Sequence, residues 1–192
     1  VRQISAFGSF AVIGLIGGNL CTQLDTFMIG RYLGQADTGV FAIATIIATL
    51  IEIPRRAITQ ISGPLIARSI QEADWASART LHQKAALNQM LIGTFLFLGL
   101  WLNIDDLFGL MSKGEVYRLG KYVVLFISLS KLIDMSAGLS NEIMGYSQYY
   151  KVSTFFVLLL ALLTYTTNLV LIPVYGITGA AAATALTILV YS

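Results

Sequence analysis

The stretch "VFAIATIIATLIEIPRRAITQISGPLIA", residues 40–67, decides the fold class. Nearly all of its first twelve residues are apolar, and no run of charges interrupts it before residue 52. A membrane core about 30 Å thick is crossed by a helix of about 20 apolar residues. At 1.5 Å per residue, this stretch would form a helix of about 42 Å. It therefore predicts a transmembrane helix that is tilted, or kinked at Pro54 or Pro64.

The composition extends this prediction to the whole chain of 192 residues. Charged residues make up 11% and hydrophobic residues 56% of the sequence, whereas soluble domains carry roughly 25% charged residues. A net charge of +2 without a basic run argues against a nucleic-acid partner. Cys21 is the single cysteine, which excludes an internal disulfide and a multi-cysteine metal site. We expect an all-α, multi-pass membrane protein with no metal and no cofactor.

Six apolar segments are long enough, or nearly long enough, to span a membrane. They are residues 5–29, 40–67, 85–102, 122–146, 152–172 and 177–192. The last segment would reach only about 24 Å, which is short of a full span. We therefore predict that residues 1–192 form one six-helix transmembrane lobe of a longer protein, with its last helix truncated.

One connection between these segments carries both apolar and charged residues. Residues 69–84 read "SIQEADWASARTLHQK", with Trp75 and Leu81 among the charges. Such a pattern predicts a short amphipathic helix within the loop of residues 70–84, at the membrane interface. The only histidine, His82, is expected to be solvated there. Five lysine or arginine residues lie near helix ends on the side of the N-terminus and of this loop, against four on the other side. This difference favours a cytoplasmic location for the N-terminus and the loop.

Three charged residues lie near the middle of residues 40–67, namely Glu52, Arg55 and Arg56. A charge at the bilayer centre costs about 2.5–3.5 kcal/mol on insertion scales, so none of the three should face lipid. Glu52 has the spacing to pair with either arginine on one helical face. One interpretation is a Glu–Arg staple between helices, with the spare arginine snorkelling to an interface. The interpretation we favour is the basic lining of a water-filled cavity, because charges within membranes usually serve function.

A polar stripe also runs along residues 122–146. Its members share one helical face: Lys131, Asp134, Gly138, Asn141 and Glu142. Lys131 and Asp134 could neutralise each other, or the stripe could face the same cavity as Arg55. In residues 5–29, Asn19 and Gln23 share a polar face with Asp25 alongside. Asp25 is either a buried proton or cation site or an end-of-helix residue near Arg31.

Three stretches of the chain resemble the polysaccharide flippase family. They are residues 23–50, residues 51–74, and residues 168–187, which read "NLVLIPVYGITGAAAATALT". This family belongs to the superfamily that includes the multidrug and toxic compound extruders. The resemblance implies the C-terminal six-helix lobe of a transporter with twelve or more helices. It implies an N-terminal lobe elsewhere in the full chain, and a central cavity open alternately to each side of the bacterial inner membrane. The substrates it implies are oligosaccharides linked to polyprenyl pyrophosphate.

Polarity and depth assign candidate roles within such a transporter. Arg55, Arg56 and Lys131 would bind the pyrophosphate, because guanidinium groups engage phosphate oxygens in pairs. Asn19, Gln23 and Asn141 would hydrogen-bond sugar hydroxyls. The candidates for ion or proton coupling are Asp25, Glu52, Asp134 and Glu142.

Three alternatives remain open at this point. A multidrug or cation antiporter of the same superfamily would favour acids, whereas the middle of residues 40–67 is net basic. A membrane-embedded transferase would require a base or nucleophile near a membrane face, for which Asp105 and Asp106 are the only candidates. A structural scaffold would not require a basic midplane. We expect a transporter and not an enzyme.

Overall fold

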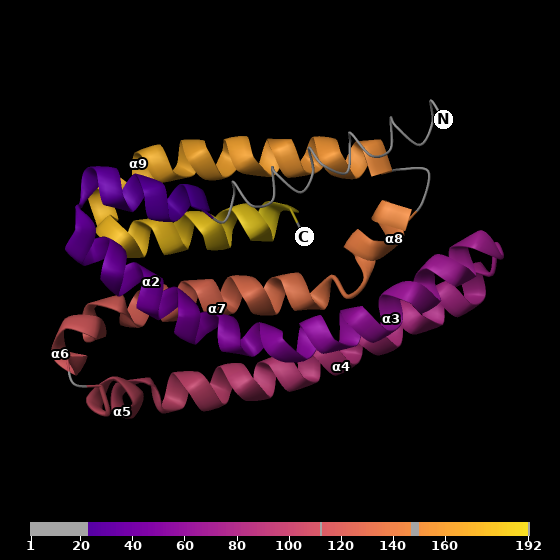
Figure 1. The fold of residues 1–192 in the computed structure, drawn as a ribbon, viewed down its shortest axis with the longest axis horizontal. Helices are drawn as coiled ribbons and strands as arrows, with labels where there is room; N and C mark the ends of the chain where they lie inside the picture. Colours follow the sequence, from indigo (N-terminus) through magenta and orange to yellow (C-terminus); the bar gives the residue numbers. More distant parts are fainter. Residues whose placement is uncertain (1–22, 112, 147–149, 192) are drawn as a thin grey trace.

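The computed structural model describes residues 23–111, 113–146 and 150–191, and the regular elements in these ranges are all helical. After helical residues 23–32, the elements follow in chain order (Figure 1). They are α2 (Gln35–Thr49), α3 (Ile53–Gln71), α4 (Trp75–Leu102), α5 (Ile104–Gly109), α6 (Gly114–Tyr117), α7 (Lys121–Ser136), α8 (Ser140–Tyr146) and α9 (Tyr150–Tyr191). The predicted all-α fold class is confirmed.

Several of these helices are long and apolar enough to cross a membrane. Within the described residues they are Gln35–Gln71, Trp75–Leu102 and Phe155–Val190, together with the bent pair α7–α8. On α4, Leu87, Leu91 and Phe95 recur every four residues and are 72–76% exposed, as expected of a face turned to lipid. The chain is thus polytopic. The first predicted segment, residues 5–29, lies largely outside the described residues. The total of six membrane spans therefore stays a prediction.

Where the sequence predicts a kink in residues 40–67, the helix instead winds more tightly over one short turn. A 3-10 turn, Leu50–Glu52, joins α2 to α3, and its flanking residues keep right-handed helical angles. Pro54 lies in the first turn of α3, where its missing N–H leaves no hydrogen bond unmade. Pro64 lies inside α3. Residues 35–71 therefore continue as one long helix.

Residues 122–146 were expected to form one helix, and this prediction was wrong. The axes of α7 and α8 differ by 56°. Between them, Gly138 adopts a φ of +60°, which favours glycine. A Cβ on Gly138 would lie 2.9 Å from the Cβ of Ala86 on α4. The chain therefore changes direction at a residue whose lack of a side chain also permits close contact with α4.

α9 folds back on itself at Gly176, where φ is +61° and the two halves of the helix meet (Figure 1). The halves lie antiparallel, and small residues line the second half. Ala180, Ala181 and Ala183 are fully buried. The repeated alanines are therefore packing positions, which allow the second half to lie close to its neighbours.

The connection between α3 and α4 is shorter than the sequence predicts. α3 ends at Gln71, and Asp74 caps α4 by accepting a hydrogen bond from the Ser77 N–H at 3.0 Å. Residues 75–84 are thus the first turns of α4, and do not form a separate short helix. Their place at the membrane interface stays a prediction.

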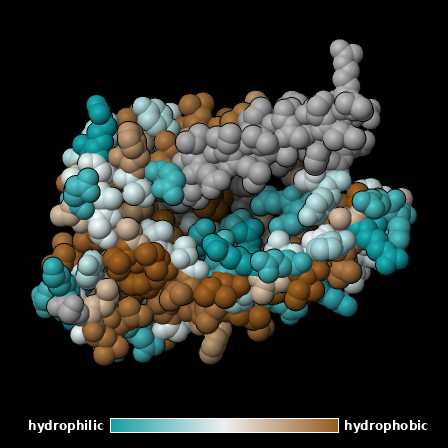
Figure 2. Space-filling view, in the orientation of Figure 1, coloured by the Kyte–Doolittle hydropathy of each residue, from teal (hydrophilic) through white to brown (hydrophobic). Residues whose placement is uncertain are grey.

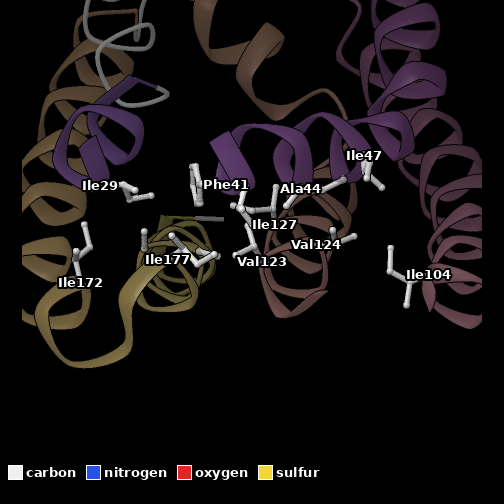
Figure 3. Close-up of a cluster of buried hydrophobic side chains, with 14 of the residues drawn as sticks. Ile29, Phe41, Ala44, Ile47, Ile104, Val123, Val124, Ile127, Ile172 and Ile177 are labelled. Carbon is white, nitrogen blue, oxygen red and sulfur yellow. The ribbon is translucent and has the colours of Figure 1, made fainter. Parts of the chain in front are cut away.

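The main hydrophobic cluster lies where helical residues 23–32, α2, α7 and α9 converge. Phe41 and Ala44 of α2 face Val123 and Ile127 of α7 (Figure 3). Ile29, Ile172 and Ile177 extend the cluster toward α9. A second, smaller cluster joins α3, α4 and Leu139 at the α7–α8 break. These two clusters fix α7 between the α2–α3 helix and α9.

Candidate functional site

Two ion pairs join the long helix of residues 35–71 to α7, one from Arg55 of α3 and one from Glu52 of the 3-10 turn before it. Arg55 donates from Nη1 to Oδ2 of Asp134. One helical turn earlier on each helix, Lys131 Nζ lies 3.2 Å from Glu52 Oε2. The four side chains are only 13–23% exposed. Lys131 and Asp134 do not neutralise each other as the sequence allowed, because each binds a partner on the neighbouring helix.

Arg56 differs from the other two bases of this cluster. Its side chain is 68% exposed, and its Nη2 lies 3.5 Å from Glu52 Oε2. That separation exceeds ordinary hydrogen-bond length, so most of the guanidinium donors of Arg56 remain available. The sequence assigned the same role to all three bases. The structure distinguishes Arg56, which faces outward, from Arg55 and Lys131, which hold α3 and α7 together.

A polar pocket of about 260 Å³ opens beside the ion pairs. Its lining consists of Glu52, Arg55, Arg56, Thr59, Gln60 and Glu142. Figure 2 shows the surrounding surface as a hydrophilic band along the middle of one face, with hydrophobic residues below it over α4. Glu142, from α8, has a buried Oε2 with no hydrogen-bond partner among the described residues. The pocket thus offers donors and acceptors inside an otherwise apolar bundle.

The expectation of a net basic midplane is corrected by this arrangement. Asp134 and Glu142 join Glu52, so three acidic side chains accompany the three basic ones. The formal charges within this cluster cancel. The basic surplus holds only for residues 40–67 taken alone. The two balancing acids, Asp134 and Glu142, come from α7 and α8, far away in the chain.

Of the predicted sugar-binding residues, Gln23 and Asn141 are not among those that line this pocket. Asn19 lies outside the described residues, and Gln23 is exposed at the start of the described chain. Asn141 is exposed on α8 and is not among the residues that line the pocket. Thr59 and Gln60 take the polar positions there instead. Their spacing from Arg56, one turn along the same helix face, was the signal that could have identified them.

Asp25 forms a second polar site, buried between helical residues 23–32 and both halves of α9. It is 5% exposed. Its Oδ1 accepts from Asn168 Nδ2 and its Oδ2 from Thr184 Oγ1, each at 2.5 Å. Asn168 belongs to the first half of α9 and Thr184 to the second. The alternative of an end-of-helix residue beside Arg31 is therefore not what the structure shows.

This second site has few other polar contacts. Asp25 makes no ion pair with the residues that the structure describes. The Asn168 side chain is fully buried, and its Oδ1 lacks a hydrogen-bond partner within the same part of the chain. Among the described residues, the site therefore consists of one carboxylate, whose neighbours are a neutral hydroxyl and a neutral amide. Sequence reasoning missed Asn168 and Thr184, although an asparagine within the apolar run 155–172 was a visible signal.

Asp105 and Asp106 do not form a paired-acid site. Asp105 is exposed and accepts from Lys121 Nζ at 2.6 Å. The same ammonium lies 5.6 Å from the centroid of the Trp101 ring, which is within cation–π range. Asp105 therefore ties α5 to the start of α7.

The pattern of long apolar helices around buried charges agrees with a comparison against protein families. The model of the MatE family matches residues 11–174. The chain belongs to the MatE family. MatE proteins are membrane transporters and not enzymes, so the transferase alternative is excluded.

Two similar proteins extend this assignment. The chain is 22% identical, over 188 residues, to a protein from Haloferax volcanii described as "Probable low-salt glycan biosynthesis flippase Agl15". That alignment covers 96% of this MatE chain and 39% of the Haloferax protein. A crystal structure of a MATE protein in complex with MaD5 superposes with a TM-score of 0.70 at 21% identity, covering 97% of this chain and 43% of that one. The chain thus has the fold of part of that MATE protein, and it spans about two fifths of the length of both proteins.

Proposed function

We propose that this chain is one lobe of a MatE-family flippase, which moves polyprenyl-pyrophosphate-linked oligosaccharides across the bacterial inner membrane by alternating access. The second lobe would be a similar N-terminal unit of the same protein. The similarity to a probable glycan flippase supports this substrate class. The short overlap with both relatives supports a two-lobe protein.

The observation that carries the proposal is the polar pocket beside Arg56. A pyrophosphate cannot cross hydrocarbon unaided, and a guanidinium with free donors binds phosphate oxygens two at a time. Arg56 meets this requirement in the present arrangement, because it is 68% exposed and its contact with Glu52 is long. Thr59 and Gln60 lie beside it to hydrogen-bond sugar hydroxyls. Asn19, Gln23 and Asn141 stay candidates for further hydrogen bonds to the sugar.

Arg55 and Lys131 would join the substrate only when α3 and α7 separate. In the present arrangement their charges are bound by Asp134 and Glu52. A substrate anion would offer the same bases a replacement partner, so binding would weaken the two ion pairs that join the helices. The anion would then bind more tightly to the conformation in which α3 and α7 are apart. A ligand that binds one conformation more tightly shifts the equilibrium toward it.

Labelling of a cysteine at position 60 tests this proposal, because Gln60 lines the pocket and its replacement leaves Arg56 in place. In the full-length protein with Cys21→Ser, we expect Gln60→Cys to react with a membrane-impermeant thiol reagent, and a polyprenyl-pyrophosphate-linked oligosaccharide to suppress that reaction. Arg68→Cys is the control, since Arg68 is an exposed residue of α3 outside the pocket. Equal labelling at position 60 with and without the lipid-linked sugar would reject the pocket as the substrate site.

For ion or proton coupling we propose Asp25 ahead of the other candidates. Glu52 and Asp134 are held by basic partners, whereas Asp25 has only neutral hydrogen-bond partners among the described residues. Glu142, whose Oε2 has no hydrogen-bond partner among the described residues, is the next candidate. We expect Asp25→Asn to abolish gradient-driven transport while substrate still protects position 60. Transport by this variant at the wild-type rate would exclude Asp25.

A multidrug or cation antiporter is the second candidate function. The observation in its favour is that the acids and bases around the pocket balance in charge, which removes the main argument against a cationic substrate. The same labelling experiment separates the two candidates. Protection of position 60 by tetraphenylphosphonium, and not by the lipid-linked sugar, would favour the antiporter.

A further inference from the structure

We propose that His82 is a positioning residue, which holds the break between α7 and α8 and thereby sets Glu142 beside the bases of the polar pocket. The importance of Glu142 for transport rests on the proposed function. The positioning itself does not, because it concerns only how α8 is held against α3 and α4.

The break leaves a backbone group that His82 satisfies. α7 ends at Ser136, and Gly138 takes a left-handed conformation. The N–H of Leu139 points to Nδ1 of His82 on α4, at 3.3 Å. The first N–H groups of a helix have no partner within that helix, so a side chain must usually supply one. His82 supplies it from a neighbouring helix, and in this role Nδ1 carries no proton.

The same ring also fills the space at the break. A Cβ added to Gly138 would lie 3.2 Å from Cε1 and 3.3 Å from Nδ1 of His82. Leu139 is fully buried in the smaller hydrophobic cluster, with Ile66 of α3 and with Ala78 and Ala85 of α4. Ile143 of α8 packs against that cluster. One hydrogen bond and one apolar anchor therefore fix the start of α8.

The position of Glu142 follows from this anchor. Glu142 comes three residues after Leu139, on the short helix α8. It lines the pocket together with Arg55 and Arg56, whereas Asp134, before the break, binds Arg55 from α7. The bend thus brings acids from two differently directed helices to the same group of arginines. Loss of the His82 bond would let α8 rotate about Gly138 and carry Glu142 away from them.

Replacement of His82 by residues that differ in acceptor position tests the proposal. Asparagine places a carbonyl oxygen near the position of Nδ1, glutamine places it one bond farther out, and leucine has no acceptor. Spin labels at Gly145 and Leu102 report the orientation of α8 relative to α4. Both sites tolerate a label, because a Cβ on Gly145 meets no atom within 4 Å and Leu102 is 77% exposed.

In the full-length protein with Cys21→Ser, pulsed EPR should give one narrow distance distribution. We expect His82→Asn to retain it, and His82→Gln and His82→Leu to broaden it or add a second distance. A role in packing alone would not distinguish Asn from Gln by acceptor position. The proposal is overturned if Gln behaves as Asn does, or if neither Gln nor Leu changes the distribution. The comparison of Asn with Gln decides the matter even if the leucine variant does not fold.

This measurement uses no substrate, so its result is independent of the proposed function. Failure of the lipid-linked sugar to protect position 60 would reject the substrate while the EPR distances still test His82. An unchanged distance distribution would reject the positioning role while protection at position 60 still supports the flippase.

Discussion

Arg55 and Asp134 form an ion pair between α3 and α7, although 79 residues separate them in the chain. Glu52 and Lys131 form a second pair between the same helices at 3.2 Å. A membrane tolerates charges of this kind when each one faces the bundle interior and has a partner. The two pairs therefore join α3 to α7 and, at the same time, keep two bases in place beside the polar pocket.

Removal of one member of the Arg55–Asp134 pair should destabilise the protein more than removal of both. Arg55→Leu leaves Asp134 without its partner, and breaking a buried pair in this way costs about 3 kcal/mol or more. Because both side chains retain some exposure, we expect the lower end of that range. The double variant Arg55→Leu/Asp134→Leu should recover much of the loss, as measured by thermal unfolding in detergent.

The exposed pair Arg68–Glu72 on α3 is the matched control. Its side chains are 75% and 57% exposed, and its atoms approach to 2.8 Å. Surface pairs contribute about 1 kcal/mol or less, so Arg68→Leu should change the unfolding temperature little. Additive effects of Arg55→Leu and Asp134→Leu in the double-mutant cycle would show that the pair does not couple the helices.

The sequence could predict these helices and mark their charged positions, because a charge within an apolar run is conspicuous. It could not predict which charges pair. Lys131 and Asp134 have the spacing of a pair within one helix, yet each binds α3 instead. Local spacing allows both arrangements, and only the packing of α7 against α3 decides between them.

The α7–α8 break and the partners of Asp25 were beyond sequence reasoning for a similar reason. Gly138 lies in an apolar stretch with helical periodicity, where an isolated glycine is usually tolerated. In its left-handed conformation it lies close to Ala86 and His82, which are far away in the chain. Asn168 and Thr184 lie 143 and 159 residues from Asp25, so no local pattern connects them.

Asn168→Leu should loosen the contact between α9 and helical residues 23–32. Asn168 is fully buried and donates to Asp25, and loss of such a bond costs about 1–3 kcal/mol when a buried partner is left unsatisfied. Thr167→Val is the control, because within the part of the chain that the structure describes the Thr167 hydroxyl bonds backbone oxygens of its own helix alone. We expect a lower unfolding temperature for Asn168→Leu than for Thr167→Val. Equal temperatures would indicate that Asp25 does not depend on Asn168.

The first turn of α4 should depend on pH through Asp74. The hydrogen bonds from Ser77 lower the pKa of the Asp74 carboxyl below its usual value of 3.8. A lowered pKa means that the cap is fully formed above the ordinary value and is lost as the pH falls through the folded-state pKa. Hydrogen exchange at residues 75–78 should therefore quicken on strong acidification, beyond its intrinsic dependence on pH.

Asp74→Asn separates this cap from its charge. Asparagine still accepts a hydrogen bond at a helix N-terminus but does not titrate there. We expect Asp74→Asn to keep slow exchange at acid pH, and Asp74→Ala to show fast exchange at every pH. The same acid dependence in all three proteins would assign it to another group.

Gly179 should be the least replaceable glycine of α9. A Cβ at this position would lie 2.2 Å from the carbonyl oxygen of Leu171, in the opposite half of the α9 hairpin. A backbone atom cannot move aside as a side chain can, so Gly179→Ala should cost about 3 kcal/mol, the upper end for overpacking. Gly99→Ala is the control, because no atom lies within 4 Å of its Cβ position and alanine stabilises a helix interior by about 1 kcal/mol relative to glycine. A Gly179→Ala protein that unfolds at the wild-type temperature would contradict the close approach of the two halves.

Gln89→Met should stabilise the protein. Gln89 lies on α4, is fully buried, and has no hydrogen-bond partner for either amide atom among the described residues. A buried unsatisfied polar group costs about 1–3 kcal/mol, and methionine has nearly the same length and shape without that group. We therefore expect a higher unfolding temperature for Gln89→Met.

The comparison with Gln83→Met isolates the effect of burial. Gln83 lies on the same helix, two turns earlier, and is exposed, so its replacement should leave the unfolding temperature almost unchanged. A lower unfolding temperature for Gln89→Met would mean that the Gln89 amide has a partner in the full-length protein. In that case its burial between helices would mark a contact that the transporter makes, and transport by the variant would fall as well.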